Sequence, residues 1–178
     1  MSRVLRAAAV LLIIATAFTG CKKERPAESE PFKFVVYPGA QYLSQLTELT
    51  KQAQTIYNPN APTAATAIYD TDAPLEQVAN YYAKEYGFGN VAPDATNNLS
   101  AAKPRAYYRV GDLHTDNEGI GPLLAKLKIT ADLSKAQGKY RAAEIDRKPN
   151  RPHVTVQRPY FDLTKSQVVD RTIILMAR

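Results

Sequence analysis

The chain has 178 residues, of which 45% are hydrophobic and 22% charged, and its formal net charge is +6. This composition excludes collagenous, coiled-coil and fully disordered proteins, because each of these shows a stronger bias. A single Cys excludes an internal disulfide and a zinc site built from several cysteines. The length predicts one globular domain with a shorter accompanying segment.

The first 20 residues have the pattern of an export signal. Arg3 and Arg6 precede an apolar run over residues 7–18, which only Thr16 interrupts. A membrane-spanning helix needs about 20 apolar residues, so the run predicts a signal peptide and not a span. The next residues, Thr19-Gly20-Cys21, resemble the lipobox of bacterial lipoproteins, although Phe18 stands where that family usually has Leu. The alternative is an ordinary secretory signal with a Cys nearby.

The lipobox resemblance implies cleavage between Gly20 and Cys21, with a diacylglycerol on the Cys21 sulfur and a palmitate-like chain on the new amine. Several chains hold a protein firmly at a bilayer, at about 0.8 kcal/mol per buried methylene. The residue after Cys21 is Lys22 and not Asp, which resembles the enterobacterial sorting pattern for the outer membrane, with the domain facing the periplasm. Residues 21–32 are rich in charge and Pro and predict a flexible tether. The predicted organisation is therefore a signal peptide (1–20), a lipid-anchored tether (21–32) and a single domain (33–178).

Three segments of the domain have helical periodicity. The spacing of Tyr42, Leu46, Leu49 and Ala53 predicts a helix over residues 41–54. The clearest helix follows Asp72-Ala73-Pro74 and ends near Gly87, with one apolar face formed by Leu75, Val78, Ala79, Tyr82 and Tyr86. A short helix is predicted from Pro122.

The remaining periodic segments predict strands at residues 34–37, 64–70, 107–110, 139–145, 153–157 and 172–176. The alternation from His153 to Gln157 predicts a half-buried strand. The run from Thr172 to Met176 is apolar on both faces and predicts a central, covered strand. Residues 162–170 are expected to form a hairpin connection. The predicted fold class is α+β: an antiparallel sheet of about five to six strands with two or three helices packed on one face.

Four short segments resemble small bacterial envelope lipoproteins of unknown function. They are YPGA (37–40), VANYYAKEY (78–86), QRPYFD (157–162) and TIILMAR (172–178). Together they cover about a third of the domain. The resemblance implies an envelope location and no particular activity.

Residues 112–121 predict a polar loop in which Asp112, His114, Asp116 and Glu118 occupy alternate positions. If the loop were extended, these four side chains would share one face and could hold a divalent cation. The alternative is a solvated polar loop. The only other histidine, His153, falls on the polar side of its predicted strand and is expected to be exposed.

A binding surface is the other candidate site. Residues 101–178 carry 15 basic and 8 acidic side chains, and the chain contains 11 Tyr. Basic side chains attract anionic lipid headgroups, peptidoglycan carboxylates or an acidic protein, and Tyr suits binding surfaces. The candidate surface residues are Tyr81, Tyr107, Tyr108, Lys139 and Arg141. A solvated basic surface without a partner is the alternative.

The sequence contains no serine-hydrolase elbow, phosphate-binding loop, dinucleotide fingerprint or zinc-protease motif. No catalytic residue is assigned and no cofactor is expected. The export signal argues against nucleic acid as a partner. We therefore expect a lipid-anchored envelope protein with a non-catalytic binding or accessory domain, whose partners are the membrane and an envelope protein or anionic envelope polymer. The alternative is a hydrolytic or metal-dependent envelope enzyme using His114, Asp116 and His153, which would require the two histidines to share a carboxylate.

Overall fold

The structure is a computed structural model and describes residues 33–60, 63–92, 105–149 and 151–178. The predicted signal peptide, the cleavage site at Gly20–Cys21 and the tether all lie outside these residues, so they remain predictions.

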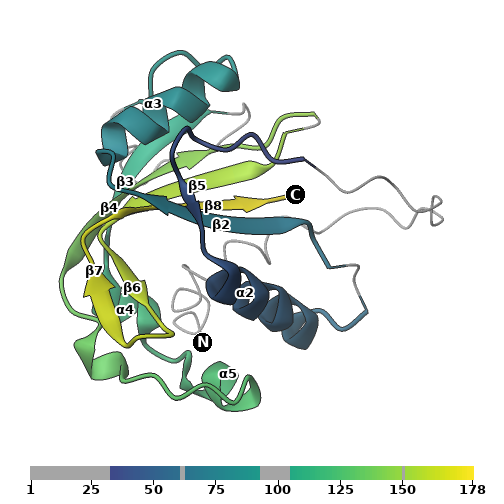
Figure 1. Ribbon diagram of the computed structural model, residues 1–178, viewed down its shortest axis with the longest axis vertical. Coiled ribbons are helices and arrows are strands. Elements are labelled where there is room, and N and C mark those ends of the chain that lie inside the picture. Colours follow the sequence, from purple (N-terminus) through teal and green to yellow (C-terminus); the bar gives the residue numbers. More distant parts are fainter. Residues whose placement is uncertain (1–32, 61–62, 93–104, 150) are drawn as a thin grey trace, which may run out of the picture.

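A six-stranded antiparallel sheet forms the centre of the molecule (Figure 1). Its strand order is β1 (Gln41–Tyr42), β2 (Thr66–Thr71), β8 (Thr172–Ala177), β5 (His153–Arg158), β4 (Lys139–Ile145) and β3 (Ala106–Asp112). The final strand thus lies between β2 and β5, as its two apolar faces predicted. A separate two-stranded hairpin, β6 (Tyr160–Asp162) and β7 (Gln167–Val169), fills the predicted connection. The α+β class and a sheet of six strands are confirmed, but residues 34–37 do not form the predicted strand, and the edge strand is β1 at Gln41–Tyr42 instead.

One face of the sheet, which we call the α3 face, is covered by helix α3 (Leu75–Glu85). The predicted apolar stripe of α3 packs here, and Val78, Ala79 and Tyr82 are fully buried. They contact the side chains of Val156 on β5 and Ile174 on β8, among others, in the largest apolar cluster of the described residues. The helix ends where Gly87 adopts a φ of 71°, a left-handed conformation that costs Gly little.

The opposite face, the α2 face, is covered by helix α2 (Ser44–Tyr57), the β6–β7 hairpin and the short helices α4 (Leu113–Asn117) and α5 (Gly121–Lys126). A 3₁₀ turn at Leu133–Lys135 packs beside α4. Ile173 faces α2 whereas its neighbour Ile174 faces α3, since successive strand residues point to opposite faces. The helices therefore cover both faces (Figure 1), which corrects the expectation that they share one.

One helix prediction needs correction in detail. The predicted helix over 41–54 begins at Ser44 and extends to Tyr57, because Tyr42 instead pairs with Tyr69 as part of edge strand β1. The buried side of α2 is formed by Thr47, Thr50 and Ala53. Thr47 is buried because its hydroxyl accepts a hydrogen bond from the Ile68 N–H over 3.0 Å, a partner that periodicity does not reveal.

The predicted loop after Asp112 contains helix α4. The Asp112 carboxylate accepts hydrogen bonds from the backbone N–H groups of His114 and Thr115, and so caps the helix. The candidate metal ligands are consequently not displayed on an extended segment.

Strand β5 is buried on both faces, where the alternation predicted half-burial. Thr155 and Gln157 are 4% and 1% exposed, as covered as Val154 and Val156. The reason is that β5 lies between β8 and β4, beneath elements on both sides. His153 is correspondingly only partly exposed.

Among the helices of the described ranges, none has the length and apolar character needed to cross a membrane.

Candidate functional site

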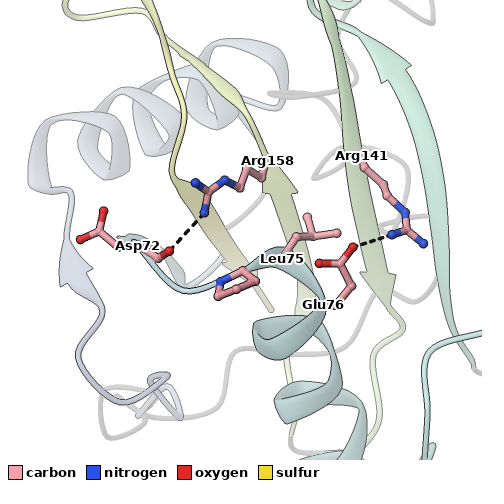
Figure 2. A pocket seen from close by; sticks show the side chains of 6 residues that line it. Asp72, Leu75, Glu76, Arg141 and Arg158 are labelled. Carbon is pink, nitrogen blue, oxygen red and sulfur yellow. Dashed lines mark hydrogen bonds and ion pairs between the residues drawn. The ribbon is translucent and has the colours of Figure 1, made fainter.

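An open pocket of about 430 Å³ lies beside the first turn of α3 on the α3 face (Figure 2). We call it the arginine pocket, because Arg141 of β4 and Arg158 of β5 approach the start of α3 from the sheet. The residues that line it are Asp72, Pro74, Leu75, Glu76, Arg141 and Arg158.

The two arginines occupy directly opposite positions in the β4–β5 ladder. Directly opposite residues of antiparallel strands project from the same face, with Cβ atoms roughly 4.5–5.5 Å apart. Like charges in this arrangement weaken strand pairing. The pocket therefore concentrates positive charge that requires anionic groups nearby.

Flanking carboxylates supply part of that negative charge. Arg141 Nη1 donates to Glu76 Oε1 over 2.5 Å, and Arg158 Nε donates to Asp170 Oδ1 over 2.8 Å. The hydrogen bond from Arg158 lowers the pKa of the Asp170 carboxyl. The Glu76 and Asp170 side chains are 53% and 79% exposed, and exposed ion pairs contribute only about 0–1 kcal/mol. An incoming anion can therefore compete for both guanidinium groups.

Other contacts hold the arginines in place. The Arg141 guanidinium lies 4.0 Å from the centroid of the Tyr108 ring, a cation–π distance. Arg158 Nη1 donates to the carbonyl oxygens of Asp72 and Ala73, immediately before α3. These contacts position both charges at the mouth of the pocket.

Of the predicted surface residues, Tyr108 and Arg141 come together at the arginine pocket. Lys139 is exposed two residues before Arg141 on β4. Tyr107 projects from the opposite face, where the Arg105 guanidinium lies 4.7 Å from its ring centroid. Tyr81 contacts the rings of Tyr37 and Tyr82, so the five residues do not form one surface.

Sequence reasoning did not identify Arg158 as a site residue. The segment QRPYFD marks its neighbourhood but gives no chemical role. Its proximity to Arg141 depends on the β4–β5 register, which no local pattern specifies.

A buried polar network occupies the α2 face. Glu144 is 3% exposed and accepts hydrogen bonds from Arg109 Nε over 2.6 Å and the Thr155 hydroxyl over 2.6 Å. Its other partner is His153 Nε2, at 3.0 Å from Oε2. Burial by itself would raise the pKa of Glu144, but the hydrogen bond with His153 and the charge of Arg109 outweigh it and lower the pKa. Glu144 is therefore a buried carboxylate held in its charged form.

Tyr140 extends this network toward α4. Its hydroxyl donates to Asp116 and accepts from Arg109 Nη1. The ring crosses over Gly111, its partner in the β3–β4 ladder, and a Cβ atom there would collide with it. Burial raises the pKa of Tyr140, so the hydroxyl stays protonated and can donate.

The candidate metal and catalytic residues have separate partners. Asp112 caps α4, Asp116 accepts from Tyr140, and His153 contacts Glu144. His114 is exposed, and Glu118 is the exposed residue that follows α4. Within the described part of the chain, no three His, Cys, Asp or Glu side chains are grouped to hold a metal ion.

Comparison with known proteins found no match: no family model, no curated protein and no solved structure matches the chain.

Proposed function

We propose that the protein is a lipid-anchored protein of the bacterial cell envelope, with its domain facing the periplasm from the outer membrane, and that this domain binds an anionic envelope polymer without catalysis. The anchor is Cys21, acylated after removal of residues 1–20. The ligand class is a polymer that carries carboxylates, such as peptidoglycan.

The observation that carries the binding proposal is the directly opposed arginine pair in an open pocket. Guanidinium groups recognise carboxylates through charge-assisted, bidentate hydrogen bonds. A ligand carboxylate between Arg141 and Arg158 would relieve their repulsion and displace only weak, exposed ion pairs. Several copies of the protein anchored in one membrane would bind neighbouring repeats of the same polymer, which raises the overall affinity.

Binding is favoured over the hydrolytic alternative by the partners of the three residues that it requires. His153 Nε2 contacts Glu144, Asp116 accepts a hydrogen bond from Tyr140, and His114 is exposed, so within the described residues these three side chains are not grouped together. The ring of His153 is hydrogen-bonded to a buried carboxylate that Arg109 also contacts, so it belongs to an internal hydrogen-bond network.

The test is co-sedimentation of the full-length, detergent-solubilised protein with isolated peptidoglycan. We expect the double variant Arg141→Gln, Arg158→Gln to lose at least tenfold in affinity. Each charge-assisted hydrogen bond contributes about 1.5–3 kcal/mol, and about 1.4 kcal/mol corresponds to tenfold.

The matched control is Lys126→Gln, Lys135→Gln, which removes two charges from exposed positions outside the pocket. It should bind like the unmodified protein. Equal losses in both double variants would show that net charge alone drives binding, and an unchanged affinity of the arginine variant would reject the pocket.

A further inference from the structure

Exposed apolar side chains gather where the described chain begins. Six large hydrophobic residues are exposed within the described ranges, and three of them, Val35, Val36 and Tyr42, fall within eight positions. Their exposed fractions are 37%, 36% and 50%. Two partly exposed rings lie beside these residues: Tyr69 is 5.4 Å from Tyr42, and Tyr81 is 5.2 Å from the buried Tyr37, between ring centroids. We call the set Val35, Val36, Tyr42, Tyr69 and Tyr81 the tyrosine edge.

The tyrosine edge is fixed to the body of the domain. The Tyr37 N–H donates to the Tyr82 hydroxyl over 3.0 Å, and that hydroxyl donates to the Val35 carbonyl over 3.2 Å. A turn closed by the hydrogen bond from the Ala40 N–H to the Tyr37 carbonyl then leads into β1. Figure 1 shows this segment passing α3 before it enters the sheet edge. The exposed side chains therefore form a built surface that a partner can meet without first ordering it.

The edge lies closest in sequence to the proposed lipid anchor. Thirteen residues lie between Cys21 and Val35, and a chain of that length reaches at most about 50 Å. Because the anchor holds the domain beside the bilayer, binding of the edge to that bilayer is effectively intramolecular. The effective concentration is on the order of millimolar, so a weak affinity of the edge for lipid is sufficient.

We propose that the tyrosine edge rests on the headgroup region of the leaflet that holds the Cys21 lipids, an inference that depends on the proposed lipid anchor. Tyr is enriched at membrane–water interfaces because its ring is apolar and its hydroxyl is polar. Val35 and Val36 supply apolar area beside the rings. The charged side chains beside this edge include Lys33, which is exposed, and Arg151 and Glu85, which both act on Tyr81. Lys51 interacts with Tyr42 and is paired with Glu48. The cations among them suit a surface that contains anionic lipids.

The absence of Trp from the chain gives a direct test. Tyr42→Trp places a single fluorophore in the edge, and Tyr57→Trp places one at the far end of α2. The two positions are matched, at 50% and 49% exposed. Because α2 has 14 residues, they are separated by about 20 Å along the helix. Each full-length, lipidated variant is reconstituted into vesicles of phosphatidylethanolamine and phosphatidylglycerol, with or without bromine on the acyl chains.

We expect brominated lipids to quench the Tyr42→Trp emission at least twofold and shift the remaining spectrum little, while Tyr57→Trp is unaffected. Equal quenching of both variants, or of neither, would overturn the docking orientation. Flotation of the same samples separates the two proposals: protein that does not float with vesicles lacks the anchor, whereas protein that floats without selective quenching is anchored but not docked. Thermal melts of both variants establish that each keeps the native fold.

Discussion

Glu144 is the central residue of the buried polar network on the α2 face. It is buried between strands β3 and β5, and its carboxylate receives the Arg109, Thr155 and His153 side chains. Removing one member of a buried ion pair leaves the other charge uncompensated, which costs more than the pair itself contributes. Arg109 Nη2 already lacks a hydrogen-bond partner among the described residues. Removal of the carboxylate charge would therefore leave the partly buried Arg109 guanidinium without its ion-pair partner.

Glu144→Gln should lower the free energy of unfolding by about 2–4 kcal/mol at pH 7, within the range for hydrogen bonds to charge and for broken buried pairs. The pKa of Glu144 is lowered in the folded state from its ordinary 4.5, so its contribution is complete above that value and is lost as the pH falls below it. The difference between the two proteins should therefore shrink below about pH 4.5. Urea unfolding at a series of pH values measures it.

Glu48→Gln is the control for this measurement, because Glu48 forms an exposed ion pair with Lys51 over 2.8 Å. Its effect should stay under about 1 kcal/mol. A Glu144 variant that is no less stable than the Glu48 variant, or a difference that does not change with pH, would contradict the role assigned to the buried carboxylate.

At the scale of elements, β8 is the strand that joins the two halves of the sheet. It pairs with β2 on one side and β5 on the other, and Ile173, Ile174 and Met176 are at most 4% exposed. Burying three such side chains contributes roughly 4.5–9 kcal/mol, comparable with a domain's net stability of about 5–15 kcal/mol. The strand also serves both apolar layers, because its alternate residues face α2 and α3.

Deletion of residues 171–178 should therefore abolish the cooperative thermal transition. Circular dichroism melts of the truncated and complete proteins provide the measurement. Val168→Ala, at an exposed position of β7, should leave the midpoint nearly unchanged. A truncated protein that still melts cooperatively within a few degrees of the complete one would show that β8 is peripheral.

Elements with a strong periodic signal were predictable from sequence. The five apolar positions of α3 and the doubly apolar run of β8 specify both the type of element and its burial, because each pattern matches one geometry. The first turn of α2 was not predictable, since Tyr42 satisfies helical spacing yet pairs with Tyr69 across the sheet. Helix α4 is too short for periodicity, and only its Asp112 cap marks it.

The candidate site was predictable only in part. Arg141 and Tyr108 were identified as surface residues from composition and strand pattern. Arg158 and Glu76 join them through tertiary contacts between β4, β5 and α3. The Glu144 network was missed for the same reason: the alternation of β5 predicts that His153 is exposed, but the α2 face is covered and His153 contacts Glu144.

At the scale of the whole molecule, the two proposed surfaces both involve the layer that contains α3, at different places on the domain. The arginine pocket opens on the α3 face, at the junction of α3 with β4 and β5. The tyrosine edge follows the opposite margin of the sheet, along β1 and β2, where the chain from Cys21 enters. A domain docked by the tyrosine edge would thus keep contact with its membrane while the arginine pocket meets an envelope polymer. This arrangement depends on the lipid anchor.

Membrane fractionation of cells that carry either the unmodified chain or Cys21→Ser tests that anchor most directly. Thr19→Ser serves as the control, because it keeps a small residue beside the cleavage site. We predict that the unmodified and Thr19→Ser proteins sediment with membranes, and that Cys21→Ser loses most of this association. Recovery of Cys21→Ser in membranes at the level of the unmodified protein would contradict the account.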